Sequence, residues 1–236
     1  MIATSSRTRE LTISSKWPRI TALRIELLIA LVLLVLANFP LLGSRCNTAL
    51  LFLPDRVIAG EWWRVFTHPW VHVSWYNLAL DAGAFLMLYA DLRSLTPFQR
   101  IAACVMAAAG SLLTALCFDG HLSTNGICGL SGIAHGLMAI SALEMMRSAR
   151  APVLVRLGAA LFCLVVIKCA AEAITGTVIF DGLHGGRVGA PVAVSHAGGV
   201  LGVLFMTAVG NLRRSRAQDQ PDATVSGGRL ASLAGR

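Results

Sequence analysis

Long apolar runs separated by shorter polar stretches dominate the hydrophobic pattern of this chain. About twenty consecutive apolar residues are enough for a helix to cross ~30 Å of hydrocarbon. The pattern therefore predicts an all-α membrane protein whose single membrane domain is a bundle of six transmembrane helices. The expected spans are residues 22–42, 71–90, 99–118, 130–147, 152–174 and 193–211.

Polar tails flank the expected membrane domain. Residues 1–20 are polar and basic, and residues 213–236 contain Gly, Ser, Asp and Arg without an apolar period. Such composition favours solvated or disordered chain. We therefore divide the protein into an N-terminal tail (1–20), a membrane domain (21–212) and a C-terminal tail (213–236), and we expect no cleavable signal peptide.

Composition and charge agree with a membrane protein. Hydrophobic residues make up 56% of the chain and charged residues 14%, whereas soluble domains contain roughly 25% charged residues. The net charge of +8 is concentrated at both termini and in the loops that share their side of the bundle. Lys and Arg mark the cytoplasmic side of membrane proteins. We therefore expect both termini to be cytoplasmic, the lipid bilayer to be the surroundings, and nucleic acid not to be a partner.

A serine between glycines opens the fourth expected span. Ser131 lies at the outer end of that span, and His196 lies near the outer end of the sixth, so the two side chains share a depth. A serine hydroxyl becomes a good nucleophile only when a neighbouring base takes its proton, and histidine suits that role. Ser131 is the candidate nucleophile and His196 the candidate base.

Glycines recur at four-residue spacing beside both candidates. Gly132 and Gly136 follow Ser131, and Gly198 and Gly202 follow His196. Small residues at this spacing let membrane helices pack closely. The pattern favours a close approach of the two helices at the candidate site, and ordinary helix packing beside an incidental Ser and His remains the alternative.

Acyl transfer also requires hydrogen-bond donors for the oxyanion. Gly129 and Leu130 precede the helix start, where backbone N–H groups are free. Asn77 and Asp81 lie on one face of the second span because they are four residues apart. The Asn77 amide can donate, whereas an ionised Asp81 would repel an oxyanion unless it is protonated or paired.

Three further polar residues lie inside the expected spans. His135 is four residues after Ser131, so it is a rival base or else a polar packing residue. Lys168 and Glu172 are also four residues apart, and burying either alone is costly. Mutual pairing of these two is the favoured interpretation, with a role toward substrate left open.

The six cysteines have no metal-ligand spacing, and no His-Glu-x-x-His motif occurs. We expect neither a metal nor an organic cofactor. Cys117 and Cys128 flank the loop before Ser131, where either a disulfide or two free thiols would fit.

These motifs together resemble the rhomboid family of intramembrane serine proteases, over residues 60–211. The matching segments are Gly129-Leu130-Ser131-Gly132, His196 with its following glycines, Trp63-Arg64, and the stretch from His72 to Asp81. In that last stretch, Asn77 replaces the family's second His and Asp81 replaces its Asn. The resemblance implies a rhomboid-like bundle and a Ser-His dyad, with His72 accessory to the site.

Within that family, the size of the chain, the motif around Ser131 and the Lys168/Glu172 pair look most like the rhombosortase branch. This resemblance implies cleavage of membrane-anchored proteins at Gly-Gly-containing C-terminal anchors, near the outer face of a bacterial inner membrane. The alternative functions are a catalytically inactive rhomboid-like protein that binds transmembrane helices, favoured by Asn77 and Asp81, and a small transporter.

Overall fold

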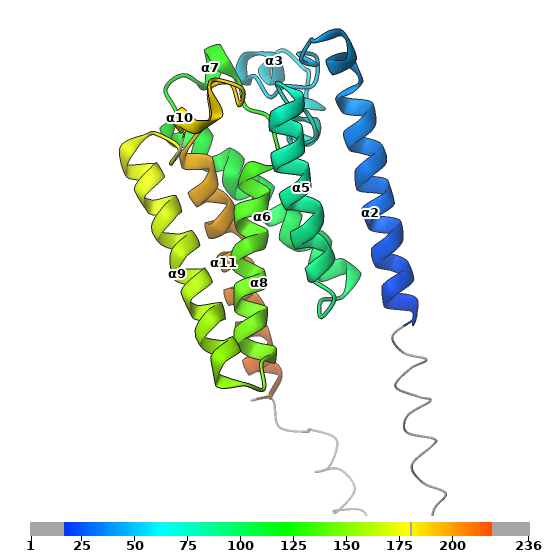
Figure 1. Cartoon of the computed structure of the whole chain (residues 1–236), viewed down its shortest axis with the longest axis vertical. Helices are drawn as coiled ribbons and strands as arrows, with labels where there is room; N and C mark the ends of the chain where they lie inside the picture. Colours follow the sequence, from blue (N-terminus) through cyan, green and yellow to red (C-terminus); the bar gives the residue numbers. More distant parts are fainter. Residues whose placement is uncertain (1–16, 180, 219–236) are drawn as a thin grey trace, which may run out of the picture.

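The computed structural model describes residues 17–179 and 181–218, which form a mostly helical bundle (Figure 1). The long helices are α2 (Trp17–Ala37), α5 (Trp75–Asp91), α6 (Pro97–Phe118), α8 (Ser131–Ser148), α9 (Pro152–Thr175) and α11 (Val194–Gln218). Short helices occupy the loops at one end: η1 (Phe39–Gly43), α3 (Pro54–Ile58), α4 (Arg64–Thr67), η2 (His68–Trp70), α7 (Leu122–Asn125) and α10 (Asp181–His184).

Four helical segments within the described residues are long and apolar enough to cross a membrane. They are Ile20–Gly43, Pro97–Phe118, Pro152–Thr175 and Val194–Asn211. Helices α5 and α8 fall outside this group because they are shorter or more polar, and both contain candidate site residues. The expectation of helices long and apolar enough to cross a membrane is therefore confirmed, and the count of six spans stays a prediction.

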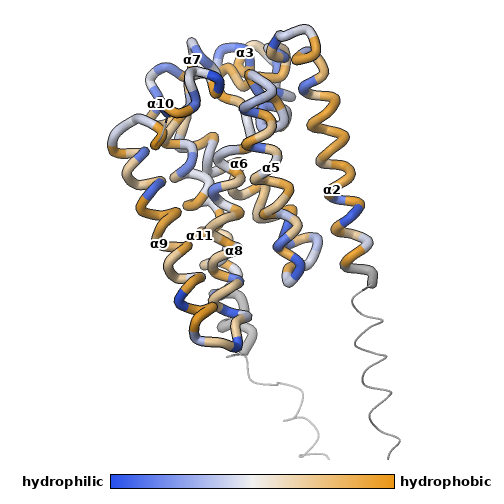
Figure 2. Tube along the Cα trace, viewed as in Figure 1, coloured by the Kyte–Doolittle hydropathy of each residue, from blue (hydrophilic) through white to orange (hydrophobic). Residues whose placement is uncertain are grey.

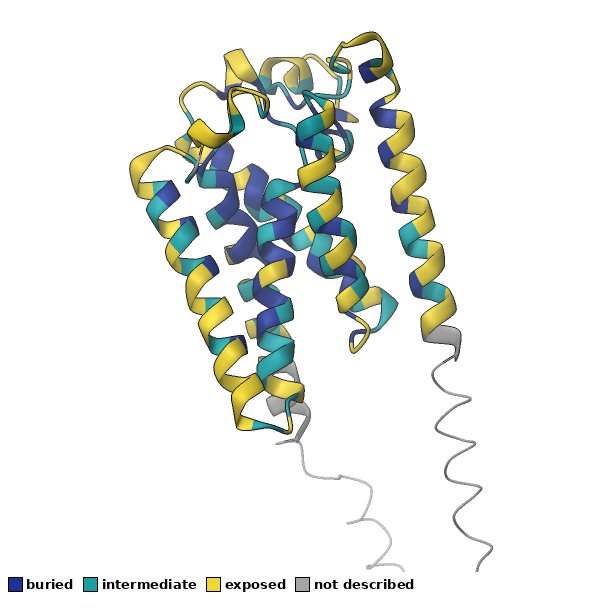
Figure 3. Ribbon diagram, viewed as in Figure 1, coloured by how far each residue is buried: buried dark blue, intermediate teal, exposed yellow. Residues whose placement is uncertain are grey.

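The outward faces of the bundle are apolar. Figure 2 shows that α2 and α9 are hydrophobic over most of their length, and Figure 3 shows that their outer sides are exposed while burial concentrates in α8 and α11. Exposed apolar side chains around a bundle fit contact with lipid rather than with water.

Helices extend into both of the predicted tails. Helix α2 begins at Trp17, and α11 continues to Gln218 instead of ending near residue 212. Loss of the apolar pattern does not end a helix when the following residues, here Leu, Arg, Ala and Gln, have high helix propensity. The remainder of both predicted tails, residues 1–16 and 219–236, lies outside the described residues.

Helix α11 packs most extensively against α6 and α8, and these contacts join backbone to backbone. A Cβ atom on Gly198 would lie 2.7 Å from the carbonyl carbon of Gly110 on α6. A Cβ on Gly199 would lie 2.7 Å from the carbonyl carbon of Gly132, and one on Gly136 would lie 2.7 Å from the carbonyl oxygen of Gly199. Only glycine permits these approaches. The contacts of Gly199 with Gly132 and Gly136 hold α8 and α11 together, whereas Gly198 and Gly202 face α6, so the expectation that both four-residue glycine pairs line the α8–α11 contact is wrong for the second pair.

Candidate active site

A cavity of about 350 Å³ lies at the end of the bundle that carries α3, α7 and α10. Residues of α5, α8, α9 and α11 and of the loops at residues 125–128 and 178–192 line it. It brings together most of the candidate residues predicted from the sequence: Asn77, Asp81, Ser131, His135, Lys168 and His196. Glu172 does not line this cavity, although it contacts three residues that do, Lys168, Ile179 and His196.

Ser131 is the first residue of α8, directly after a sharp turn of the chain. Gly129 adopts φ +94°, a conformation that L side chains rarely adopt. Its N–H donates to the His68 carbonyl oxygen at 3.1 Å, and Leu130 accepts the first helical bond, from Ala134, at 2.8 Å. The turn therefore places the serine at the helix start, where backbone N–H groups have no partner within the helix.

The loop of residues 44–74 fixes this turn from outside the bundle. Phe52 and Ile127 exchange two backbone hydrogen bonds of 3.1 and 3.0 Å. The buried Arg64 donates from Nη1 to the carbonyl oxygens of Thr48 and Leu51, both at 2.7 Å. One arginine thus satisfies carbonyl groups that would otherwise be unpaired inside the loop.

The disulfide considered between Cys117 and Cys128 is not formed, since all six cysteines of the chain are free. Burial raises the pKa of the Cys128 thiol to about 12, so this side chain stays a protonated thiol and a weak nucleophile at neutral pH. The backbone hydrogen bonds between Phe52 and Ile127, rather than a disulfide, hold the loop that precedes Ser131.

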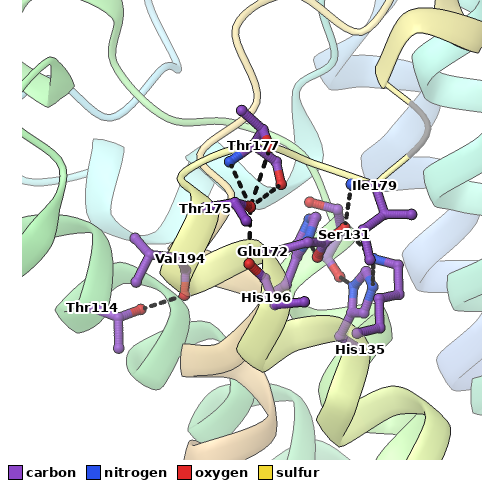
Figure 4. Close-up of polar contacts among 11 residues, drawn as sticks. Thr114, Ser131, His135, Glu172, Thr175, Thr177, Ile179, Val194 and His196 are labelled. Carbon is purple, nitrogen blue, oxygen red and sulfur yellow. Dashed lines mark hydrogen bonds and ion pairs between the residues drawn. The ribbon is translucent and has the colours of Figure 1, made fainter.

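His196 is held by a buried carboxylate (Figure 4). Its Nδ1 lies 2.7 Å from Oε2 of Glu172, whose side chain is fully buried. The other oxygen, Oε1, accepts from Lys168 Nζ at 2.7 Å and from the backbone N–H of Ile179 at 2.9 Å. The predicted pairing of Lys168 with Glu172 is therefore present, but the sequence did not indicate the contact with His196.

His135 uses both of its ring nitrogens. Nδ1 lies 2.7 Å from the carbonyl oxygen of Ser131, and Nε2 lies 2.9 Å from Nζ of Lys168. A carbonyl only accepts and an ammonium only donates, so Nδ1 carries the proton and Nε2 accepts from the lysine. The ring also stacks on His196, with centroids 4.1 Å apart. In this geometry His135 has no free nitrogen to take a proton from Ser131.

Asp81 faces the start of α8. Its Oδ2 accepts from Asn77 Nδ2 at 3.3 Å and lies 3.7 Å from Nε2 of His72. The backbone N–H groups of Leu130 and Ser131 also interact with this carboxyl group. Neither ring nitrogen of the fully buried His72 has a hydrogen-bond partner among the described residues. The candidate oxyanion donors therefore surround an acidic group.

One cluster has the donor atoms of a metal site. Atoms of His135, Cys169 and Glu172 lie within 4.8 Å of one another. However, Lys168 donates to both His135 and Glu172, so a cationic ammonium already bonds to two of the three residues. The donor atoms are used in an ionic hydrogen-bond network, and they do not fit a metal cation.

Comparison with known proteins places this arrangement in a family. Residues 59–216 match the family model described as the Rhomboid domain, a range that contains Ser131, His135, Glu172 and His196. No curated protein and no solved structure matches the chain. Because the match extends over more than half of its length, the chain belongs to the rhomboid family, whose members are generally intramembrane serine proteases.

Proposed function

We propose that this protein is an intramembrane serine endopeptidase that acts through Ser131 and His196. The observation that carries the proposal is their common cavity: a hydroxyl at the start of α8 and an imidazole on α11 line one space. The glycine contacts between these two helices support it, because they limit how far the two side chains can separate.

The proposed reaction is acyl transfer to the serine followed by hydrolysis. Ser131 Oγ attacks the substrate carbonyl carbon while Nε2 of His196 takes the hydroxyl proton. The same nitrogen then gives that proton to the leaving amine as the peptide bond breaks. Water, deprotonated by His196, clears the acyl-enzyme. The N–H of Ser131 and the amide of Asn77 would stabilise the oxyanion.

The proposed substrates are membrane-anchored proteins. The asymmetric distribution of Lys and Arg supports cytoplasmic termini and a cavity that opens toward the outer face of a bacterial inner membrane. The resemblance of the motif around Ser131 to the rhombosortase branch supports Gly-Gly-containing C-terminal anchors as the cleaved segments.

A serine-reactive fluorophosphonate probe tests the nucleophile. We expect the purified protein in lipid nanodiscs to be labelled, and Ser131→Ala and His196→Ala to lose the label. Ser148→Ala is the matched control, because Ser148 lies at the opposite end of the same helix and its hydroxyl donates to the Glu144 carbonyl oxygen. Labelling that persists in Ser131→Ala would contradict the assignment of the nucleophile.

A reporter with a C-terminal anchor tests the substrate class. We expect cleavage of an anchor that contains Gly-Gly, and at least tenfold slower cleavage when both glycines are replaced by leucine. Equal cleavage of the two reporters would keep the protease activity but reject the proposed anchor specificity.

The position of Asp81 favours a second candidate function, an inactive rhomboid-like protein that binds transmembrane helices. Its carboxyl group interacts with the N–H groups of Leu130 and Ser131 that an oxyanion would require. The two functions differ in the probe experiment, because an inactive protein would capture anchored proteins without any labelling of Ser131.

A further inference from the structure

We propose that Glu172 is a positioning residue for His196, so that the site is a Ser131–His196–Glu172 triad rather than a dyad. This inference rests on the proposed function and adds a third residue to it. The sequence indicated Glu172 as an ion-pair partner of Lys168, four residues earlier on α9, with a role toward substrate left open. The contact across to α11, 2.7 Å from Oε2 to Nδ1 of His196, gives the carboxylate a second task.

The surrounding bonds identify the ionised form of Glu172. Oε1 accepts from the Lys168 ammonium at 2.7 Å and from the Ile179 N–H at 2.9 Å. A fully buried carboxylate is tolerated when it is paired with a cation and its remaining lone pairs are satisfied. These two donors meet that requirement at one oxygen, which leaves Oε2 to accept from His196.

The tautomer of His196 follows from this contact. A carboxylate has no hydrogen to donate, so Nδ1 of His196 must carry the proton that joins it to Oε2. The neutral ring then has its lone pair on Nε2, which is the nitrogen that can take the proton from Ser131. A carboxylate that fixes this tautomer and stabilises the imidazolium formed during the reaction is the third member of serine-protease triads.

Lys168 makes the hydrogen-bond partners of His135 different from those of His196. Its ammonium donates to Nε2 of His135 as well as to Glu172, so the two stacked imidazoles have different partners and different available nitrogens. His135 is saturated by Lys168 and by the Ser131 carbonyl, whereas His196 receives the carboxylate. The arrangement thereby selects one of two adjacent histidines as the base.

The test is Glu172→Gln. A glutamine can still accept from Lys168 and from Ile179 through its carbonyl oxygen, but its amide donates toward Nδ1 of His196. The ring then adopts the opposite tautomer, with the proton on Nε2, and can no longer accept from Ser131. The corresponding carboxylate-to-amide change in a serine-protease triad lowers kcat by about 10⁴-fold, so we expect fluorophosphonate labelling to slow by roughly 10²- to 10⁴-fold.

Two measurements keep the outcome unambiguous. The first is the labelling rate of the full-length protein in nanodiscs, with Glu144→Gln as the matched control, because Glu144 bonds to Ser94 and Arg147 far from the cavity. The second is the ¹⁵N NMR tautomer of His196, assigned by the signals lost in His196→Gln. We expect Nδ1–H in the wild type and Nε2–H in Glu172→Gln.

The results separate the two proposals. A wild-type protein that is labelled through Ser131, together with a Glu172→Gln variant labelled at the same rate, overturns the triad and leaves the protease assignment intact. An Nε2–H tautomer in the wild type also overturns the triad, even if Glu172→Gln fails to fold. A wild type that is not labelled at Ser131 overturns the proposed function itself.

Discussion

Replacing Gly136 by alanine is the sharpest test of how the bundle holds its candidate active site. Gly136 lies on the face of α8 that meets both α6 and α11. A Cβ atom at this position would lie 2.7 Å from the Cβ of Ala107 and 2.7 Å from the carbonyl oxygen of Gly199. Both neighbours are helix backbone or attached directly to it, so neither can move without moving its helix.

The size of the effect follows from these distances. Carbon atoms pack best at about 3.5–4.0 Å, so the helices must separate by roughly 0.8 Å to accept the methyl group. Overpacking of this kind typically costs ~1–3 kcal/mol in unfolding free energy. A displacement of about 1 Å between reacting groups can slow a reaction ~10²-fold. We therefore expect Gly136→Ala to lower the free energy of unfolding by ~1–3 kcal/mol and to slow the reaction of Ser131 by up to ~10²-fold.

Thermal unfolding in detergent micelles and the rate of fluorophosphonate labelling measure the two effects. Gly83→Ala is the matched control, because Gly83 lies within α5 and a Cβ there would contact nothing within 4 Å. This control should keep its labelling rate and its stability. If Gly136→Ala unfolds at the wild-type temperature and labels at the wild-type rate, the glycine contact does not set the geometry of the site.

Three further predictions concern charge. Asp81→Asn should speed labelling roughly tenfold by removing a negative charge beside the oxyanion donors; slower labelling would mean that the acid itself is required. Glu26→Ala should lower the unfolding free energy by ~3–5 kcal/mol. It leaves the buried Arg100 guanidinium without the carboxylate to which its Nε and Nη2 donate at 2.8 and 3.0 Å. In thermal unfolding, adding Arg100→Met should restore much of this loss. Burial lowers the pKa of His68 from 6.5 to about 4, so on acidification the unfolded chain takes up this proton before the folded protein does. The free energy of unfolding should therefore fall as the pH falls between these two pKa values, by ~3 kcal/mol in total. If the stability of a His68→Asn variant falls just as steeply in pH-dependent unfolding, His68 is not the cause.

The apolar pattern predicted the long helices well because a helix in contact with lipid must be apolar over most of its length. Helix α8 begins at Ser131, one residue from its expected start. The start of α5 was less accurate: it was expected at residue 71, but the helix begins at Trp75 after Ser74, whose hydroxyl accepts from the Asn77 N–H. The residues before Ser74 are apolar enough to extend the hydrophobic pattern, but the Ser74 cap fixes the start of the helix after them.

Individual side-chain bonds of the site were predictable where one helix contained both partners. Lys168 and Glu172 are four residues apart on α9, so their pairing follows from helix geometry. The bond from Glu172 to His196 depends on how α9 and α11 are rotated toward each other, which a periodic pattern does not specify. The packing of Gly199 was not predicted for a related reason. Four-residue spacing identified Gly198 and Gly202 as packing residues, whereas Gly199, noted only as part of the motif after His196, faces a different neighbour, α8.

The hydrogen bond from the Ile179 N–H to Glu172 joins the cavity lining to its charged network. Ile179 belongs to the loop after α9, and it lines the same cavity as Ser131. A protein segment that pushes this loop aside to reach the serine would remove one of the donors that hold the carboxylate. Access to the cavity and orientation of the imidazole therefore share a single peptide group, so under the proposed mechanism displacement of this loop would also loosen the carboxylate that holds His196.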